Sequence, residues 1–405
     1  MRLFEILLIL VCVTDGSARI IQAHRRPFWL SILPLLAFLI GIIHAAGEGT
    51  RWQMNPVYVV VLATFTSALI RAFRSGETGE GSLARYSGIL VLVPSLATIA
   101  AGTALPVYEL PIPRGDYSVG VRETHLGPSV IAFIYYPTDK PSGTRASLDN
   151  KSVKDYKNHL ATRYGIPVMA LGHIGRLETH ASEGASLSRE LPRYRVLIAE
   201  PEADRPALHA ISLAGELASR GFIVIVPSVY DSASTVDAIV EKLETLDPTG
   251  ASGWLAERLD LARVGIYGFG EAGERVLEAC VDGAFRAGAT IGYTGPISST
   301  PTPLLVFRPE DAGDPPIRAV EETTYIVAAR GMLAGNFSDD ALVSPLMPVL
   351  GEFGTIDPYR ASAITGAYVG AFFNKHLTRG TVEHLMDGPS NDYPEVTIQI
   401  HDAEE

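Results

Sequence analysis

Long apolar stretches fill the first quarter of the chain, before short apolar and amphipathic runs begin to alternate. Four of these stretches precede residue 107; they cover residues 3–21, 27–46, 54–73 and 86–105. The last three approach or reach the roughly 20 residues that an α-helix needs to cross a bilayer. The pattern predicts a transmembrane region of about four helices over residues 1–107. Buried helices of a soluble protein would be the other interpretation of such a set.

The first stretch is the weakest of the four, because Glu5, Asp15 and Arg19 interrupt it. A cleaved signal peptide is the alternative for this segment. No small-residue cleavage site leads into a polar start, and Arg25-Arg26 is followed directly by another apolar run. These features favour a retained helix.

Arginine positions predict the orientation of the four helices. The connection after the first stretch, counted with the end of that stretch, holds Arg19, Arg25 and Arg26. The connection after the third, counted in the same way, holds Arg71, Arg74 and Arg85, whereas Arg51 stands alone between the second and third stretches. Because positive charge marks cytoplasmic loops, the first and third connections are expected inside. The chain is therefore predicted to be a multi-pass membrane protein with a large extracytoplasmic C-terminal domain. That orientation holds even if the first stretch does not span.

After residue 108 short β-branched runs alternate with helical periodicity, which is typical of a mostly parallel sheet covered on both faces. Residues 119–126 and 130–136 are expected to form an antiparallel pair at its start. Strands are expected at 194–199, 222–227, 264–267, 289–292, 304–307 and 323–328, and helices at 207–219, 235–246, 272–281 and 361–376. The predicted domain covers residues 108–380, with 138–193 unassigned. Residues 381–405 are expected to be a loosely held acidic tail.

Charge excludes one class of partner. The chain has a net charge of −12, while its first 110 residues carry 8 arginines, no lysine and 6 acidic residues. The second part is therefore strongly acidic, which argues against nucleic-acid binding. The two cysteines, Cys12 and Cys280, are far apart in sequence and lie in separate predicted domains, so neither a disulfide nor a cysteine metal site is expected.

One short segment has the form of a catalytic turn. Residues 264–274, V-G-I-Y-G-F-G-E-A-G-E, predict a buried strand, a glycine-rich turn and the start of a helix. This is the context of the G-x-S-x-G nucleophile elbow, but Gly270 stands at the middle position. The same letters match G-x-G-x-x-G. A dinucleotide site is disfavoured because four strands come first and Gly292 stands near the expected acidic position.

Several segments together resemble the platelet-activating factor acetylhydrolase family. The similar segments are L-A-S-R-G-F-I-V-I-V at 217–226, the glycine turn at 268–273, F-S-D at 337–339, G-T-I-D-P at 354–358 and A-F-F-N-K-H-L at 371–377. The resemblance covers roughly residues 115–378. It implies an α/β-hydrolase fold and a lineage that hydrolyses phospholipid esters. E-G-T-R-W-Q-M at 48–54 looks like the bacterial membrane-anchored branch.

Carried over position by position, the resemblance predicts a site without its catalytic side chains. The triad-equivalent positions are Gly270 for the serine, Gly292 for the aspartate and Ala334 for the histidine. The oxyanion-equivalent positions are Ala203 and Glu271, and Glu200 and Glu202 precede the former. A serine hydrolase needs a hydroxyl nucleophile, an imidazole base and two N–H donors for the oxyanion. No catalytic residue is therefore expected to be intact.

These positions predict a catalytically degenerate protein with a binding or structural role, as a scaffold or subunit of a membrane assembly. Membrane lipid and a membrane-protein partner or second copy are the expected partners, with no cofactor or metal. The alternative is an active membrane-anchored esterase or phospholipase. Its rewired site would pair a histidine with Glu200, Glu202 or Glu271, or use those acids as metal ligands. Ser228, Ser232 and Ser234 are interpreted as helix-capping residues.

Overall fold

The structure is a computed structural model, in which the chain forms two compact units. It describes residues 2–21, 28–73, 81–104, 108–126, 131–141, 145–147, 150–202, 205–229, 236–249, 252–313, 315, 320–378 and 383–403. The first unit contains residues Met1–Val107 together with Ile166–Ile174, and the second contains Tyr108–Gly165 and Gly175–Glu405. The short segment 166–174, which the sequence analysis placed in the C-terminal domain, thus belongs with the helices.

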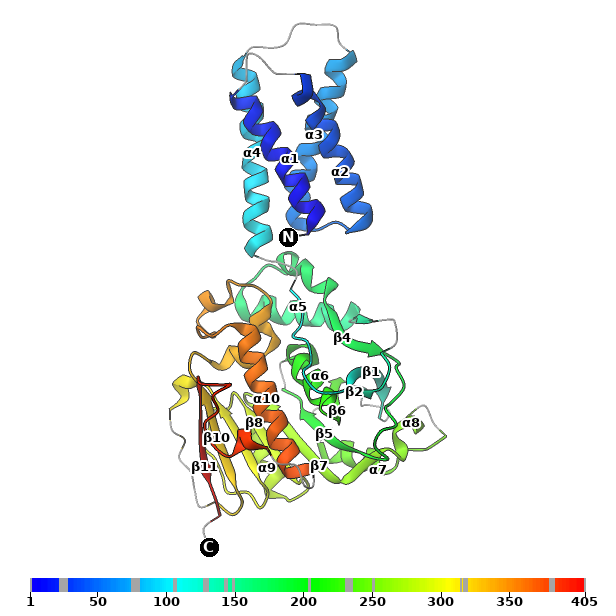
Figure 1. The fold of residues 1–405 in the computed structure, drawn as a ribbon, viewed down its shortest axis with the longest axis vertical. Coiled ribbons are helices and arrows are strands. Elements are labelled where there is room, and N and C mark those ends of the chain that lie inside the picture. Colours follow the sequence, from blue (N-terminus) through cyan, green and yellow to red (C-terminus); the bar gives the residue numbers. More distant parts are fainter. Residues whose placement is uncertain are drawn as a thin grey trace. The chain divides into compact units, whose positions relative to one another are not determined.

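Four α-helices make up the first unit (Figure 1). They are α1 (Leu3–Ile21), α2 (Leu33–Gly47), α3 (Asn55–Phe73) and α4 (Gly81–Ala104), with 3₁₀ turns η1 (Phe28–Ile32) and η2 (Trp52–Met54). The indole Nε1 of Trp52 donates to the carbonyl of Ala170, 3.2 Å away. Three stretches are long and apolar enough to cross a membrane: Leu30–Gly47, Trp52–Phe73 and Arg85–Ala104. The charged helix α1 does not meet that criterion.

A close glycine contact and the Glu5–Arg51 ion pair connect α1 to the rest of this helical unit, and a second ion pair lies within α1. A β-carbon on Gly88 of α4 would lie 2.7 Å from the carbonyl oxygen of Gly16, so the two backbones approach closely there. Asp15 and Arg19 are buried and form an ion pair of 2.7 Å. Glu5 is buried as well and pairs with Arg51 at 3.3 Å.

An eleven-stranded sheet forms the centre of the second unit, in the order β11-β10-β9-β8-β7-β5-β6-β2-β1-β4-β3. The strands are β1 (Ser118–His125), β2 (Ile131–Thr138), β3 (Arg145–Ser147), β4 (Glu178–Glu183), β5 (Tyr194–Glu200), β6 (Phe222–Val229), β7 (Leu259–Phe269), β8 (Ala287–Ile291), β9 (Leu304–Arg308), β10 (Thr324–Ala329) and β11 (Val396–His401). β1 and β2 pair antiparallel, and β5 to β10 are parallel where they pair with one another. The expected mixed sheet is therefore confirmed.

Helices cover both faces of this sheet (Figure 1). The helices are α5 (Asn150–Tyr164), α6 (Ile211–Ser219), α7 (Val236–Glu244), α8 (Gly253–Ala256), α9 (Ala272–Val281) and α10 (Pro358–Leu377). Val276 of α9 packs on the face of β7 that carries Ile266. Phe373 of α10 packs at Gly265, on the opposite face. The parallel strands thus bury both faces, which explains their continuous apolar runs.

The unassigned segment 138–193 and the C-terminal tail are more ordered than expected. The former supplies β3, α5, the 3₁₀ segment η3 (Val168–Arg176) and β4. The latter was predicted to be loose, but β11 pairs antiparallel with β10 over six residues. The alternation of V-T-I-Q-I-H fits an edge strand with one covered face. The prediction of a loose tail was wrong because it relied on acidic composition instead of this alternation.

Candidate functional site

The turn after β7 has the backbone of a nucleophile elbow. Gly270 follows the last residue of β7 with φ of 49°, and α9 begins two residues later. Its N–H donates to the carbonyl of Ile291 at the end of β8, at 2.9 Å. A β-carbon on Gly268 would lie 2.9 Å from Val276 Cγ2. This glycine therefore lets the strand and the helix pack closely. Close packing explains the glycine without a phosphate-binding site.

Glu202 occupies the space in front of the elbow. A β-carbon placed on Gly270 would lie 3.0 Å from Glu202 Oε1. That is tighter than ordinary van der Waals contact, and a serine hydroxyl would have to extend beyond it. The carboxylate thus lies directly beside the position from which a side chain on residue 270 would extend.

The other two triad-equivalent positions lie on the same carboxyl-terminal edge of the sheet. Gly292 directly follows β8 with φ of 71°, and a β-carbon there would lie 3.2 Å from Cδ2 of Phe337. Phe337 ends the turn η6 (Ala334–Phe337), which Ala334 begins with an exposed side chain. An aromatic ring therefore covers the position predicted for the acid.

The oxyanion-equivalent positions are only partly described. Ala203 lies outside the described residues. Glu271 precedes α9, and its side chain is exposed. Glu200, at the end of β5, is buried and forms an ion pair of 2.5 Å with Arg275 of α9. Glu200 thus links the strand to the helix behind the elbow, which is a structural role.

Arg205 and His209 surround Glu202 from the segment before α6. Arg205 Nε lies 3.2 Å from Glu202 Oε2, and His209 Nε2 lies 3.8 Å from the same oxygen. The imidazole stacks edge-on against Phe269, the residue before Gly270, at 5.3 Å between ring centres. Its Nδ1 faces the carbonyl oxygen of Pro206 at 2.9 Å, so Nδ1 carries a proton. The sequence analysis named the carboxylate but not this histidine.

Burial dominates the ionisation of both Glu202 and His209. It raises the pKa of Glu202, and the nearby Arg205 lowers it in part. Burial also lowers the pKa of His209 to about 4, and the charge of Arg205 acts in the same direction. The imidazole is therefore neutral at pH 7.

A small cavity lies beside Phe269, among the residues that the structure describes. The residues that line it include Glu202, Arg205, His209 and Phe269, and they enclose a cavity of only 30 Å³. One water needs roughly 10–15 Å³ by this measure, so this cavity has room for one or two waters.

Two adjacent buried aspartates, Asp339 and Asp340, connect their segment to helices α6 and α5 by hydrogen bonds. Asp339 accepts a hydrogen bond from the backbone N–H of Ser212 at 2.9 Å and so caps α6. Asp340 accepts from the hydroxyls of Tyr156 and Tyr164 of α5, at 2.7 and 3.1 Å. Burial raises the pKa of Asp339 to about 7. The F-S-D segment therefore has a structural role here.

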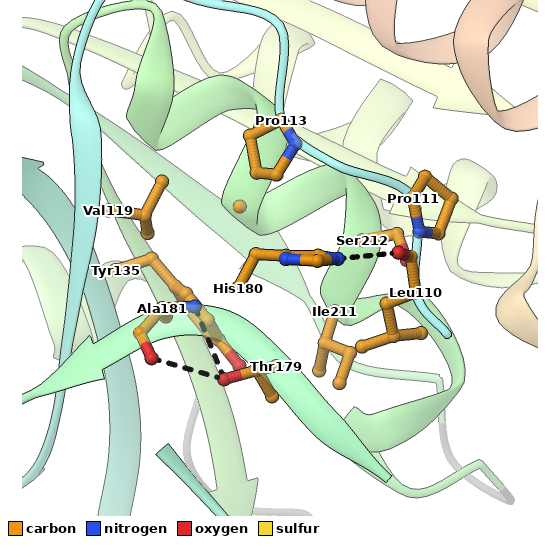
Figure 2. Close-up of a pocket in the computed structure, with 11 residues that line it drawn as sticks. Leu110, Pro111, Pro113, Val119, Tyr135, Thr179, His180, Ala181, Ile211 and Ser212 are labelled. Atoms are coloured by element: carbon orange, nitrogen blue, oxygen red, sulfur yellow. Dashed lines mark hydrogen bonds between the residues drawn. The ribbon is translucent and has the colours of Figure 1, made fainter. Parts of the chain in front are cut away.

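Other candidate groups are held in structural positions. His180 of β4 points to the linker before β1, where its Nε2 donates to the carbonyl of Leu110 at 2.8 Å (Figure 2). The pocket around it has a volume of 20 Å³. His376 packs against Phe372 within α10. Ser228 lies within β6 and seven residues or more before α7, so its interpretation as a helix-capping residue was wrong. Ser232 and Ser234 lie outside the described residues, and so does the side chain of Ser228. Among the residues that the structure describes, no group of three or more His, Cys, Asp or Glu is placed to hold a metal.

Comparisons with known proteins bear on the fold. No protein-family model matches the chain, and no curated protein matches it. Among solved structures, it is similar to a ferulic acid esterase from Streptomyces cinnamoneus, with a TM-score of 0.51 and 22% sequence identity. The match covers 72% of this chain and 99% of the esterase. At this identity the likeness shows the fold alone: the chain carries a mixed α/β sheet of the α/β-hydrolase type.

Proposed function

We propose that this protein is a membrane-anchored member of the α/β-hydrolase type that has lost ester hydrolysis. Its role would be structural or binding, as a scaffold or subunit of a membrane assembly. The resemblance to platelet-activating factor acetylhydrolases would then concern ancestry and fold rather than activity.

The position of Glu202 carries this proposal. Its Oε1 lies 3.0 Å from where a β-carbon on residue 270 would be, so the position that lacks the serine also has a carboxylate directly beside it. A carboxylate there would also repel the oxyanion that forms during acyl transfer. Phe337 lies beside the acid position in the same way. Loss of the serine or the histidine alone can cost about 10⁶-fold in turnover, so the later losses carry little further penalty.

The size of the elbow cavity favours an assembly role over a lipid receptor that uses the old catalytic pocket. A volume of 30 Å³ is far below the roughly 300–1,000 Å³ of small-molecule sites. The membrane lipid expected as a partner would therefore surround the helical unit rather than enter the elbow.

The side chains of α1 support its inclusion among the membrane helices. Glu5, Asp15 and Arg19 are buried within the helical unit, while Leu3, Leu10 and other large apolar residues of α1 are exposed. This is the reverse of a soluble amphipathic helix. Charged residues in membrane helices face the bundle interior and pair there. We therefore propose that four helices span the membrane, with the second unit extracytoplasmic.

The contact between His209 and Glu202 supports one alternative function. A neutral imidazole 3.8 Å from a carboxylate could activate a water molecule, which would give a rewired esterase. Hydrolysis of p-nitrophenyl acetate by the purified full chain separates the two functions. The degenerate site predicts turnover equal in the wild type and His209→Asn. A rate that falls at least a hundredfold in His209→Asn would establish the rewired esterase instead.

The assembly role has its own experiment. The full chain, extracted from its native membrane in mild detergent, should migrate as a complex larger than its own monomer. Mass spectrometry of that complex should identify a membrane-protein partner at fixed stoichiometry, or a second copy of this chain. A monomer with no associated chain would contradict the assembly role.

A further inference from the structure

Basic residues are concentrated in one short part of a chain that is acidic as a whole. Residues 150–177 contain five basic residues and one acidic residue, although the chain has a net charge of −12. Helix α5 begins this segment and holds three of the six lysines of the chain: Lys151, Lys154 and Lys157. Such a concentration of one sign on a single helix is an electrostatic surface that an anionic partner would recognise.

The neighbours of α5 do not cancel this charge. Arg163, near the end of the helix, forms an ion pair with Glu352 at 2.8 Å, so those two charges offset each other. Asp155 is the one acidic residue of α5. Lys154 is exposed and Lys157 is half-buried, and neither forms an ion pair with another residue that the structure describes. The helix therefore keeps a net positive charge.

An exposed apolar turn lies beside the C-terminal end of α5. The turn is η8 (Met347–Leu350), and residues 341–351 around it contain no charged side chain. Val349 of this turn is 81% exposed. Phe353, just after the turn, packs against Tyr164 of α5 with the ring centres 5.7 Å apart. Exposed apolar side chains next to lysines are typical of a surface that lies in the membrane–water interface.

The chain passes between the two units at three points, and all three lie beside α5. Tyr108, the first residue of the second unit, lies close to Tyr156 of α5. Gly165 directly follows α5 and is the last residue before the chain returns to the helical unit. Gly175 begins the remainder of the second unit, and a β-carbon on it would lie 3.9 Å from Val153 Cγ1 of α5.

The first of these connections is short. The proposed membrane helix α4 ends at Ala104, and Tyr108 is four residues further along the chain. Four residues of extended chain reach at most about 15 Å. Because Tyr108 lies close to α5, the surface of a bilayer that α4 spans is within reach of α5.

We propose that α5 and η8 rest on the surface of the bilayer and bind anionic phospholipid there. Lys154 and Lys157 would face the phosphate groups, and Val349 would lie at the boundary between the headgroups and the acyl chains. This contact would hold the second unit in one orientation on the membrane. The proposal rests on the proposed membrane helices, but it does not depend on the state of the elbow.

Quenching of a fluorophore by spin-labelled lipid tests this contact. In a background of Cys12→Ala and Cys280→Ala, Val349→Cys is labelled with an NBD fluorophore. The full chain is then reconstituted in nanodiscs of phosphatidylglycerol and doxyl-labelled phosphatidylcholine. We expect the label at position 349 to be quenched at least twofold more than a label at Glu244→Cys, an exposed position on α7 that lies far from α5 (Figure 1).

A label on the helical unit separates the two proposals. Leu62→Cys lies in α3, where the side chain of Leu62 is 59% exposed, and it should be quenched if α3 spans the bilayer. Quenching at position 62 without quenching at position 349 would overturn the surface contact and leave the membrane helices in place. No quenching at either position would contradict the membrane helices and the contact together.

Lysine variants test the recognition of headgroup charge. Each lysine at an anionic surface contributes about fivefold to binding, so Lys154→Gln/Lys157→Gln should remove at least half of the quenching at position 349. Lys140→Gln/Lys242→Gln removes the same charge from two other exposed positions and should have no effect. Replacing phosphatidylglycerol by phosphatidylcholine should weaken the quenching as the first pair does. Equal quenching in both lipids, or in both lysine variants, would overturn the binding of anionic phospholipid by α5.

Discussion

At the residue scale, a single carboxylate restricts what residue 270 can be. Gly270 has positive φ, which costs other L-residues about 1–2 kcal/mol, and the Glu202 carboxylate lies directly beside the position from which a side chain would extend. Restoring the serine therefore meets two separate costs. One is local to the backbone, and the other depends on Glu202.

These two costs can be measured apart. Gly270→Ser should destabilise the protein by about 1–3 kcal/mol, since the cost of backbone strain adds to that of moving the Glu202 carboxylate by a few tenths of an ångström. Gly283→Ser is the matched control, because Gly283 also has positive φ but open space around its β-carbon position; it should cost only about 1 kcal/mol. Shifts in the unfolding transition of the full chain report both values.

Removing the Glu202 carboxylate should restore part of the stability that Gly270→Ser loses. In the double-mutant cycle of Gly270→Ser with Glu202→Ala, the two changes should couple favourably by at least about 0.5 kcal/mol. Gly283→Ser combined with Glu202→Ala should be additive. If both pairs behave alike, Glu202 does not occupy the nucleophile position.

His209 makes a prediction about acid stability. The unfolded chain binds a proton at this residue below its ordinary pKa of 6.5, whereas the folded chain keeps it neutral down to about pH 4. Stability is therefore lost as pH falls from 6.5 to 4, by up to about 3 kcal/mol from this residue. Asp339 acts in the opposite sense: its raised pKa reduces stability as pH rises from about 4 to 7.

His209→Asn isolates the histidine contribution, because its amide can still donate to the carbonyl of Pro206. The melting temperature of this variant should fall less than that of the wild type between pH 6.5 and 4. The difference between the two proteins cancels the titration of Asp339 and other groups. Parallel pH profiles would show that His209 is not held neutral by burial.

The sequence predicted the turn but not what fills the site. A glycine between a buried strand and a helix indicates an elbow, and the strand after α9 locates Gly292. The placement of Glu202 over Gly270 depends on how the loop after β5 folds back. The ring of Phe337 over Gly292 likewise depends on a contact between residues 45 positions apart. Neither follows from local pattern.

At the scale of elements, parallel strands were easier to predict than the edges of the sheet. Strands such as β5 and β6 are buried on both faces and show continuous apolar runs. β3 has three residues, and β4 lies within a polar segment, so neither carries a distinct signal. β11 was missed because its acidic surroundings outweighed six alternating residues.

Removing β11 tests whether the tail is part of the fold. Deletion of residues 396–405 should lower the melting temperature by several degrees and promote aggregation, because β10 would become an exposed edge. Deletion of residues 402–405 alone leaves β11 intact and should have little effect. Equal stability of the two truncated proteins would contradict a structural role for this strand.

At the scale of the whole molecule, the chain combines an apolar helical unit with an acidic α/β unit. Composition alone predicted this division, because the change at residue 108 is abrupt. It did not predict that residues 166–174 return to the helical unit, since such a contact has no periodic signal. The distribution of arginines predicts the orientation in the membrane.

Cysteine labelling tests that orientation. In a background of Cys12→Ala and Cys280→Ala, Ala403→Cys should react with a membrane-impermeant maleimide in intact spheroplasts. Arg71→Cys, at the exposed end of α3, should react only after permeabilisation, because the third connection is expected to be cytoplasmic. The reverse pattern of labelling would place the α/β unit in the cytoplasm.

Loss of the serine nucleophile is tested most directly by covalent labelling. The purified full chain is incubated with a fluorophosphonate, and its intact mass is measured beside that of an active serine esterase treated in the same way. We expect the esterase to gain one phosphonate group per chain and this protein to keep its original mass. Stoichiometric addition to any serine of this chain would show that a nucleophile is active and would contradict the degenerate site.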